Sequence, residues 1–175
     1  MDFIAMEMID TVISNIFWSN KIKNMEYSNP IIGNEYNSVC KYILIDKLSS
    51  YLKISKNNSL SKLSVISSIF SFLLYRTIDD FNDVILISPS DKLSLKNPIL
   101  LKFENKIDVS FKAFLNHAAV EVKEAYIHRS YNDKLDLEMY SGFSIRYDEV
   151  NQDNLNNNIS LFYQEFEKEI KFTIS

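Results

Sequence analysis

The stretch Asp83-Val84-Ile85-Leu86-Ile87-Ser88-Pro89 is a short apolar run, rich in β-branched residues, that stops at a proline. This composition favours a β-strand. A second apolar run, Ile99 to Phe103, follows Pro98 and predicts another strand. The middle of the chain is therefore expected to contribute two strands to a sheet.

A helix is predicted on each side of these two strands. Leu60 to about Arg76 leaves little polar surface, so we expect a deeply buried helix with Ser59 as its N-cap. Val109 to His128 also has apolar residues at helical spacing, with Asp108 or Ser110 as cap. The apolar sets are Leu63, Ile66, Ile69, Phe70, Phe72, Leu73 and Leu74 in the first helix, and Phe111, Phe114, Leu115, Ala118, Val122 and Ala125 in the second.

The N-terminal part of the chain predicts a helix, a loop, a strand and a short helix. Between Asp2 and Lys23 the apolar residues form one stripe of an amphipathic helix. Pro30 and Gly33 then indicate a loop. The run Tyr36 to Ile45 is apolar on both faces, as a strand inside a covered sheet would be. Asp46 is expected to cap the short helix that follows. The stripe consists of Ile9, Val12, Ile13, Ile16 and Phe17, and the short helix is marked by Leu48, Tyr51 and Leu52.

Three further strands are predicted in the C-terminal part, at Phe143 to Asp148, Ile159 to Tyr163 and Glu169 to Ile174. The Asn-rich stretch Asn151 to Asn158 predicts a surface loop between two of them. The predicted order is α, β, α, α, β, β, α, β, β, β. This order is typical of an α/β (α+β) domain in which helices cover a sheet, and residues 1–175 fit one such domain.

Composition places the chain among ordinary globular proteins and argues against several classes of partner. It has 46% hydrophobic and 24% charged residues and a formal net charge of −4, without a basic cluster that would bind nucleic acid. No secretion signal or membrane-spanning helix is predicted from the N-terminal stretch. Cys40, the single cysteine, is expected to be a buried strand residue. A free thiol and the absence of a signal favour the cytoplasm.

The sequence offers no constellation for catalysis, for a cofactor or for a metal. His117 and His128 are the only histidines, and eleven positions on one helix separate them by about three turns, so they cannot bind one metal ion. Both are expected to be structural or solvated. Gly33 and Gly142 are the only glycines, which excludes a glycine-rich phosphate loop. The acidic groups Asp79, Asp80 and Asp83, and Asp148 with Glu149, are interpreted as solvated surface.

Five short motifs, taken in order, resemble the condensation domains of nonribosomal peptide synthetases, which consist of two lobes similar to chloramphenicol acetyltransferase. The resemblance concerns the second lobe, and it extends from Trp18 to about Glu149. Trp18 is similar to the anchor of the helix that follows the first lobe in that family. The motifs are Ile16-Phe17-Trp18-Ser19-Asn20-Lys21, the helix Leu60 to Thr77 with its end Leu74-Tyr75-Arg76-Thr77, the strand Asp83 to Pro89, Asn97-Pro98-Ile99-Leu100-Leu101-Lys102-Phe103, and Val109-Ser110-Phe111-Lys112-Ala113-Phe114-Leu115.

The resemblance implies a single truncated lobe with a mixed β-sheet covered by helices, and it brings no catalytic residue with it. The family's His-His-x-x-x-Asp-Gly motif belongs to the first lobe and does not occur here. At the position where the family usually has a glycine in this strand, this chain has Ile87 or Ser88. The segment Ser90-Asp91-Lys92 stands where an arginine often follows the proline in the family. No catalytic, cofactor-binding or metal-binding residue is therefore predicted.

Three functions are compatible with these observations. The first is a noncatalytic platform or docking element for an adenylation or carrier domain of a synthetase. The second is half of an acyltransferase or condensation enzyme that another chain or a symmetry mate completes. The third is an unrelated α/β interaction domain. The peptide product, the partner domain and self-association into a homo-oligomer are left open by the sequence.

Overall fold

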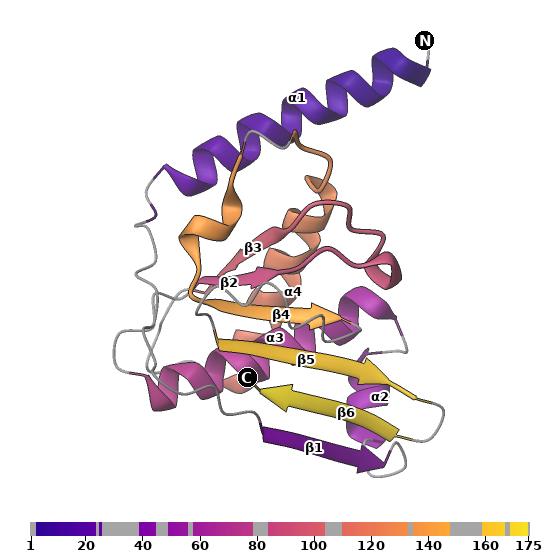
Figure 1. The fold of residues 1–175 in the computed structure, drawn as a ribbon, viewed down its shortest axis with the longest axis vertical. Helices are drawn as coiled ribbons and strands as arrows, with labels where there is room; N and C mark the ends of the chain where they lie inside the picture. Colours follow the sequence, from indigo (N-terminus) through magenta and orange to yellow (C-terminus); the bar gives the residue numbers. More distant parts are fainter. Residues whose placement is uncertain are drawn as a thin grey trace.

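The computed structural model describes residues 3–23, 25, 39–44, 49–55, 58–78, 84–103, 110–132, 135–147, 159–166 and 169–174. A six-stranded sheet in the order β1-β6-β5-β4-β2-β3 forms its centre (Figure 1). Strand β4 is parallel to β2 and β5, whereas the other three pairs are antiparallel. The sheet is thus mixed, as expected. The strands are β1 (Val39–Leu44), β2 (Val84–Ile87), β3 (Ile99–Lys102), β4 (Phe143–Tyr147), β5 (Ile159–Glu165) and β6 (Glu169–Ile174).

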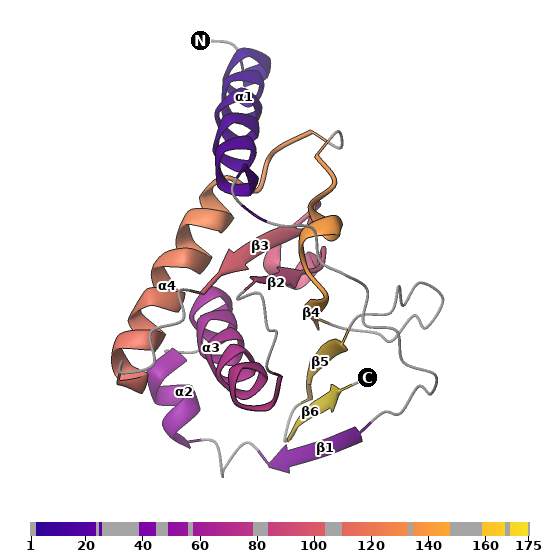
Figure 2. The same cartoon turned by 90° about the vertical axis from the view of Figure 1, so that its left-hand side faces the viewer.

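Of the four α-helices among the described residues, three lie on the same face of this sheet. Figure 2 shows α2, α3 and α4 together on that face, while α1 extends away from the rest of the molecule. The element order agrees with the predicted one, and the fold class α/β is confirmed. No helix among the described residues combines the length and the apolar character needed to cross a membrane. The α-helices are α1 (Phe3–Ile22), α2 (Ser49–Ser55), α3 (Ser59–Thr77) and α4 (Phe111–Ile127), and two short 3-10 helices span Asp91–Leu93 and Leu137–Tyr140.

The core is centred on β2, the strand predicted from Asp83 to Ser88. All four of its residues are buried, and its neighbours β3 and β4 are buried almost throughout. Ile85 and Ile87 are fully enclosed, as are Leu100 of β3 and Ile145 of β4. Burial on this scale, at about 25 cal/mol per Å² of apolar surface, makes these strands the main source of stability in the fold.

The buried face of helix α3 contains serines as well as large apolar residues. Ser64, Ser67, Ser68 and Ser71 are all buried. The hydroxyl of Ser67 donates to the carbonyl oxygen of Leu63 at 2.8 Å, and that of Ser68 donates to the carbonyl oxygen of Ser64 at 2.6 Å. Bonds to the preceding turn satisfy the buried hydroxyls, and the small side chains allow neighbouring elements to pack close to the helix backbone.

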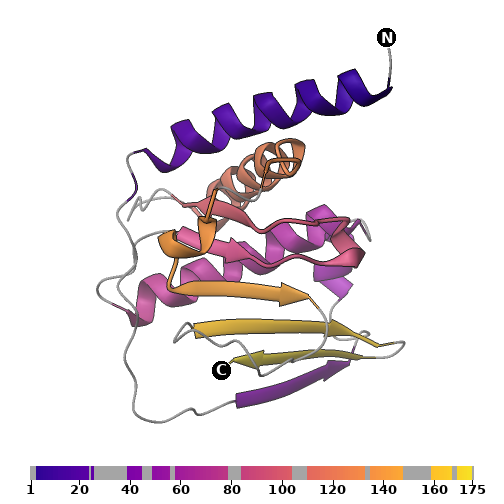
Figure 3. The same cartoon turned by 45° about the horizontal axis from the view of Figure 1, so that its top comes forward.

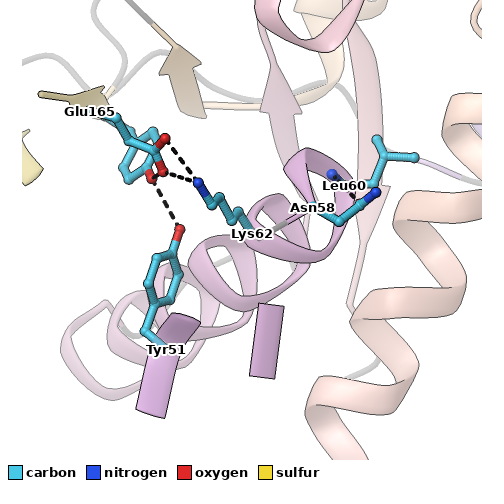
Figure 4. A network of polar contacts seen from close by, with 6 residues as sticks. Tyr51, Asn58, Leu60, Lys62 and Glu165 are labelled. Atoms are coloured by element: carbon cyan, nitrogen blue, oxygen red, sulfur yellow. Dashed lines mark hydrogen bonds and ion pairs between the residues drawn. The ribbon is translucent and has the colours of Figure 1, made fainter. Parts of the chain in front are cut away.

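Two details of α3 differ from the prediction. Its N-cap is Asn58 and not Ser59, because the Asn58 Oδ1 atom accepts hydrogen bonds from the backbone N–H groups of Leu60 and Ser61 at 3.0 and 3.1 Å (Figure 4). The helix is also not buried all round: Ile69, Phe72 and Leu73 are exposed. The cap of α4 is Ser110, one of the two residues predicted for it.

Strand β1 is an edge strand, which overturns the prediction that it lies inside a covered sheet. Among the described strands it pairs with β6 alone, and Val39, Cys40 and Tyr42 are all exposed. The expected burial of Cys40 is therefore wrong, since the strand lies at the end of the sheet. The loop around Pro30 and Gly33, the cap Asp46, the loop Asn151 to Asn158, and the acidic groups Asp79, Asp80, Asp83, Asp148 and Glu149 lie outside the described residues.

Candidate functional site: the projecting helix α1

The C-terminal half of α1 is attached to the body of the protein by Trp18. This side chain is fully buried, and its Nε1–H group donates a hydrogen bond to the carbonyl oxygen of His128 at 2.7 Å. The Tyr131 ring meets the indole edge-on at a centroid distance of 5.9 Å, and Phe17 stacks on the His128 ring at 4.1 Å. The anchor predicted at Trp18 thus holds α1 against the C-terminal end of α4.

An ion pair fixes the direction of α1 relative to α4 and the sheet. Lys21 Nζ lies 2.7 Å from Glu121 Oε2, and both side chains are largely buried. The same carboxylate oxygen accepts a hydrogen bond from the backbone N–H of Lys102 at 3.1 Å. Glu121 therefore joins α1, α4 and the edge strand β3. A charge-assisted bond in such a half-buried position is stronger than one at an open surface.

The N-terminal half of α1 projects beyond these contacts, as Figures 1 and 3 show. From Met8 to Ile16, on both sides of the middle of the helix, α1 exposes five large apolar side chains, which we call the α1 stripe. The sequence predicted most of this stripe but not its exposure. Trp18 follows Ile9 by nine residues, or about two and a half turns, so the buried and exposed apolar residues lie on opposite faces of the helix. The α1 stripe consists of Met8, Ile9, Val12, Ile13 and Ile16, each at least 48% exposed.

The two histidines lie apart, and neither belongs to a metal or catalytic cluster in the described part of the chain. His128 takes part in the α1 anchor. His117 lines a polar pocket of about 260 Å³ between α1, α4 and β3, together with Lys21, Lys102 and Glu121. Its Nε2 atom is buried without a hydrogen-bond partner among the described residues. Within those residues, no group of three or more His, Cys, Asp or Glu side chains is placed to bind a metal ion.

A polar network that the sequence did not predict joins α2 and α3 to β5 (Figure 4). The hydroxyl groups of Tyr51 and Tyr163 lie 3.1 Å apart, and the Tyr163 hydroxyl donates to Glu165 Oε1. Lys62 Nζ donates to both carboxylate oxygens of Glu165, at 2.7 and 2.9 Å. Four side chains from three elements thus form one continuous chain of hydrogen bonds.

The charges in this network indicate a structural role. Burial raises the pKa of Tyr51 to about 12. Burial and the hydrogen bond to Glu165 raise the pKa of Tyr163 above its ordinary value. Burial alone would raise the pKa of Glu165, but the hydrogen bonds from Lys62 and Tyr163 hold it below its ordinary value. At neutral pH the tyrosines are protonated and Glu165 is ionised, so an ion pair and neutral hydroxyl donors link α2, α3 and β5.

The network is expected to make stability fall in alkaline solution. Because the folded pKa of Tyr51 is about 12 against 10.0 for a free tyrosine, its contribution is complete below pH 10 and is lost as the pH rises through about 12. Urea denaturation between pH 9 and 12 should therefore show a smaller loss of stability in Tyr51→Phe than in the parent. Tyr42→Phe, at an exposed position of β1, is the control. Equal pH dependence in Tyr51→Phe and the parent would contradict the proposed protonation states.

Several solved structures of known proteins are similar to this fold. No protein-family model and no curated protein matches the sequence. The structure is similar to the starter condensation domain of rhizomide synthetase RzmA, with a TM-score of 0.67 and 11% identity over 95% of this chain and 46% of that one. It is similar to VibH, a condensation enzyme of nonribosomal peptide synthesis, with a TM-score of 0.67 and 10% identity over 98% of this chain and 51% of that one.

A third similar structure is the EpoB cyclization-docking bidomain from Sorangium cellulosum, with a TM-score of 0.65 and 11% identity over 94% of this chain and 43% of the other. The chain thus spans about half the length of the structures that it matches. This protein has the fold of one half of a nonribosomal peptide synthetase condensation domain.

Proposed function

We propose that this protein is a noncatalytic half-condensation domain that docks on an adenylation or carrier domain of a peptide synthetase. The observation that carries the proposal is the α1 stripe, which is apolar and exposed. The Trp18 anchor fixes the C-terminal part of α1, so the stripe is presented to solvent. The half-length match to condensation domains supports the synthetase setting. The motif order, from Trp18 to Glu149, assigns the chain to the second lobe in this proposal.

The α1 stripe has the properties of a helix that binds in a groove. Its residues follow the i, i+3, i+4, i+7 spacing with which an amphipathic helix is recognised by an apolar partner. Contiguous apolar surface of this kind is a mark of interaction sites on proteins that are otherwise well packed. Because Lys21 and Trp18 fix the other end of α1, the helix is presented in a defined direction and loses little freedom on binding.

The described residues also support the absence of turnover by the chain alone. In the family that the sequence resembles, the acid–base histidine belongs to the other lobe. Here His128 is engaged in the α1 anchor through its ring and its carbonyl group. The side chains of the Tyr51–Tyr163–Glu165–Lys62 network are bonded to one another across α2, α3 and β5. In this proposal the protein supplies contacts and leaves chemistry to other domains.

Binding of the purified protein to adenylation and carrier domains, measured by calorimetry, tests the proposal. The double variant Val12→Asp/Ile16→Asp should weaken binding at least tenfold, because each buried side chain of this size contributes roughly 1.5–3 kcal/mol and a tenfold change needs about 1.4 kcal/mol. Val120→Asp adds a charge at an exposed apolar position of α4, outside the α1 stripe, and should bind like the parent.

Two results would contradict the proposal. The first is no binding to any adenylation or carrier domain encoded beside this protein. The second is steady multiple turnover of acyl thioesters with simple amines, either by the protein alone or by its mixture with another chain. Turnover by the mixture would instead establish half of an enzyme completed in trans, the alternative suggested by the half-length match.

A further inference from the structure

An apolar cavity of about 440 Å³ lies between the sheet and its covering helices. Its inner wall is formed by side chains of α3 and of two strands, among them Val65, Ile66 and Phe70 of α3, Leu161 of β5 and Phe172 of β6. All but Phe172, which is half-buried, are buried. The inner wall of the cavity therefore belongs to the core, and no residue of the α1 stripe lines it.

The cavity opens to solvent between the helices. Ile54 of α2, Ile69 and Leu73 of α3 and Phe111 of α4 line it, and each of these residues is about half exposed. Figure 2 shows these three helices side by side on one face of the sheet. A volume of this size lies in the range of small-molecule sites, which are mostly apolar with few polar groups. A ligand can enter here without displacing a core side chain.

Among the described residues, two polar side chains line the cavity, and their positions indicate which class of ligand fits it. Tyr51 contributes its ring, but its hydroxyl group is bonded to that of Tyr163. Lys41 is exposed on the edge strand β1, opposite Phe172 in the register, so its side chain lies on the cavity face of the sheet. The ligand that matches such a site has an apolar body and a single anionic group near Lys41.

We propose that this cavity binds an unbranched fatty acid, with the alkyl chain between α3 and the sheet and the carboxylate at Lys41. A methylene group takes about as much space as a water molecule, about 30 Å³, so the cavity has room for a chain of about 15 carbons. The chain would bury apolar surface against Ile66, Leu161 and Phe172. The carboxylate would form a charge-assisted contact with the Lys41 ammonium group.

Calorimetric titration of the purified protein with saturated carboxylates of about 10, 12, 14, 16 and 18 carbons tests the proposal. Affinity should rise about fourfold per added methylene, the equivalent of about 0.8 kcal/mol, and level off near about 15 carbons. Ile69→Trp should fill the mouth of the cavity and weaken dodecanoate binding at least tenfold. Phe72→Trp is the matched control, since Phe72 is an exposed residue of the same helix that does not line the cavity.

The head group is tested with a second pair of variants. Lys41→Gln should weaken dodecanoate binding severalfold and leave dodecanol binding unchanged. Lys171→Gln is the control, because Lys171 lies opposite Tyr42 on the other face of the same strand pair. Affinity that does not depend on chain length, or equal binding by Ile69→Trp and Phe72→Trp, would overturn the proposal, as would equal binding of dodecanoate by Lys41→Gln and Lys171→Gln. The experiment contains no partner domain, so its outcome is independent of the proposed docking function.

Discussion

Phe70→Ala is expected to destabilise the protein by about 3–5 kcal/mol, the usual cost of truncating a buried phenylalanine. Phe70 is 3% exposed and packs in the main hydrophobic cluster beneath α3. It also lines the apolar cavity, so its removal enlarges an existing space that the surrounding chain does not close. The midpoint of urea denaturation should fall accordingly, and the fluorescence of Trp18, the single tryptophan, provides a signal distant from the substitution.

The matched control for this variant is Phe72→Ala. Phe72 lies on the same helix but is 40% exposed, with Arg76 and Phe111 against its ring. Less apolar surface leaves the core, and no enclosed cavity forms, so the expected cost is about 1 kcal/mol. Equal losses of stability in the two variants would show that the buried face of α3 is assigned incorrectly.

The helices and strands could be predicted because the apolar residues of each follow its own period. The run from Val84 to Ile87 is a strand, and the segments around Phe70 and Phe114 are helices, within a few residues of the predicted limits. The same local patterns indicate which face of an element is apolar, but not what covers that face. Ile69 and Leu73 fit the helical stripe of α3, yet they lie at the mouth of a cavity and are exposed.

The exposure of β1 depends on which strands pair with it, and the sequence of β1 alone does not specify this. Cys40 pairs with Thr173 of β6, and none of the strands that the structure describes lies on the other side of β1. An apolar run has the same sequence pattern whether its strand lies in the centre of a sheet or at the edge. The position of Cys40 was therefore predicted wrongly although the strand itself was predicted correctly.

The candidate sites depend on residues that are distant in the chain, which is why the sequence did not reveal them. Tyr51 and Tyr163 are 112 positions apart, and Lys62 and Glu165 are 103 positions apart. Neither pair has a spacing that marks a motif. The cavity is likewise lined by Lys41 of β1 together with residues of α2, α3 and the C-terminal strands β5 and β6. Trp18 could be identified in advance because it belongs to a motif, whereas its partner at His128 could not.

Trp18→Ala is expected to destabilise the protein by about 3–5 kcal/mol and to release α1 from its position. The indole is fully buried, and its removal leaves a large cavity between α1 and the end of α4. It also removes the hydrogen bond to the His128 carbonyl group, which lies 110 positions away in the sequence. Without the indole, α1 keeps the ion pair between Lys21 and Glu121 and the stacking of Phe17 on His128. An ion pair contributes little once it becomes exposed to solvent.

Two measurements separate loss of the anchor from general unfolding. Amide hydrogen exchange of Trp18→Ala should rise sharply across α1 while protection of β2 and β4 follows the global loss of stability, because local opening exposes only the released helix. Trp18→Phe retains most of the buried ring and loses only the hydrogen bond, so it should cost about 1–2 kcal/mol and keep α1 protected. If α1 stayed protected in Trp18→Ala, the helix would be held by contacts other than this anchor, and the fixed presentation of the α1 stripe would need another cause.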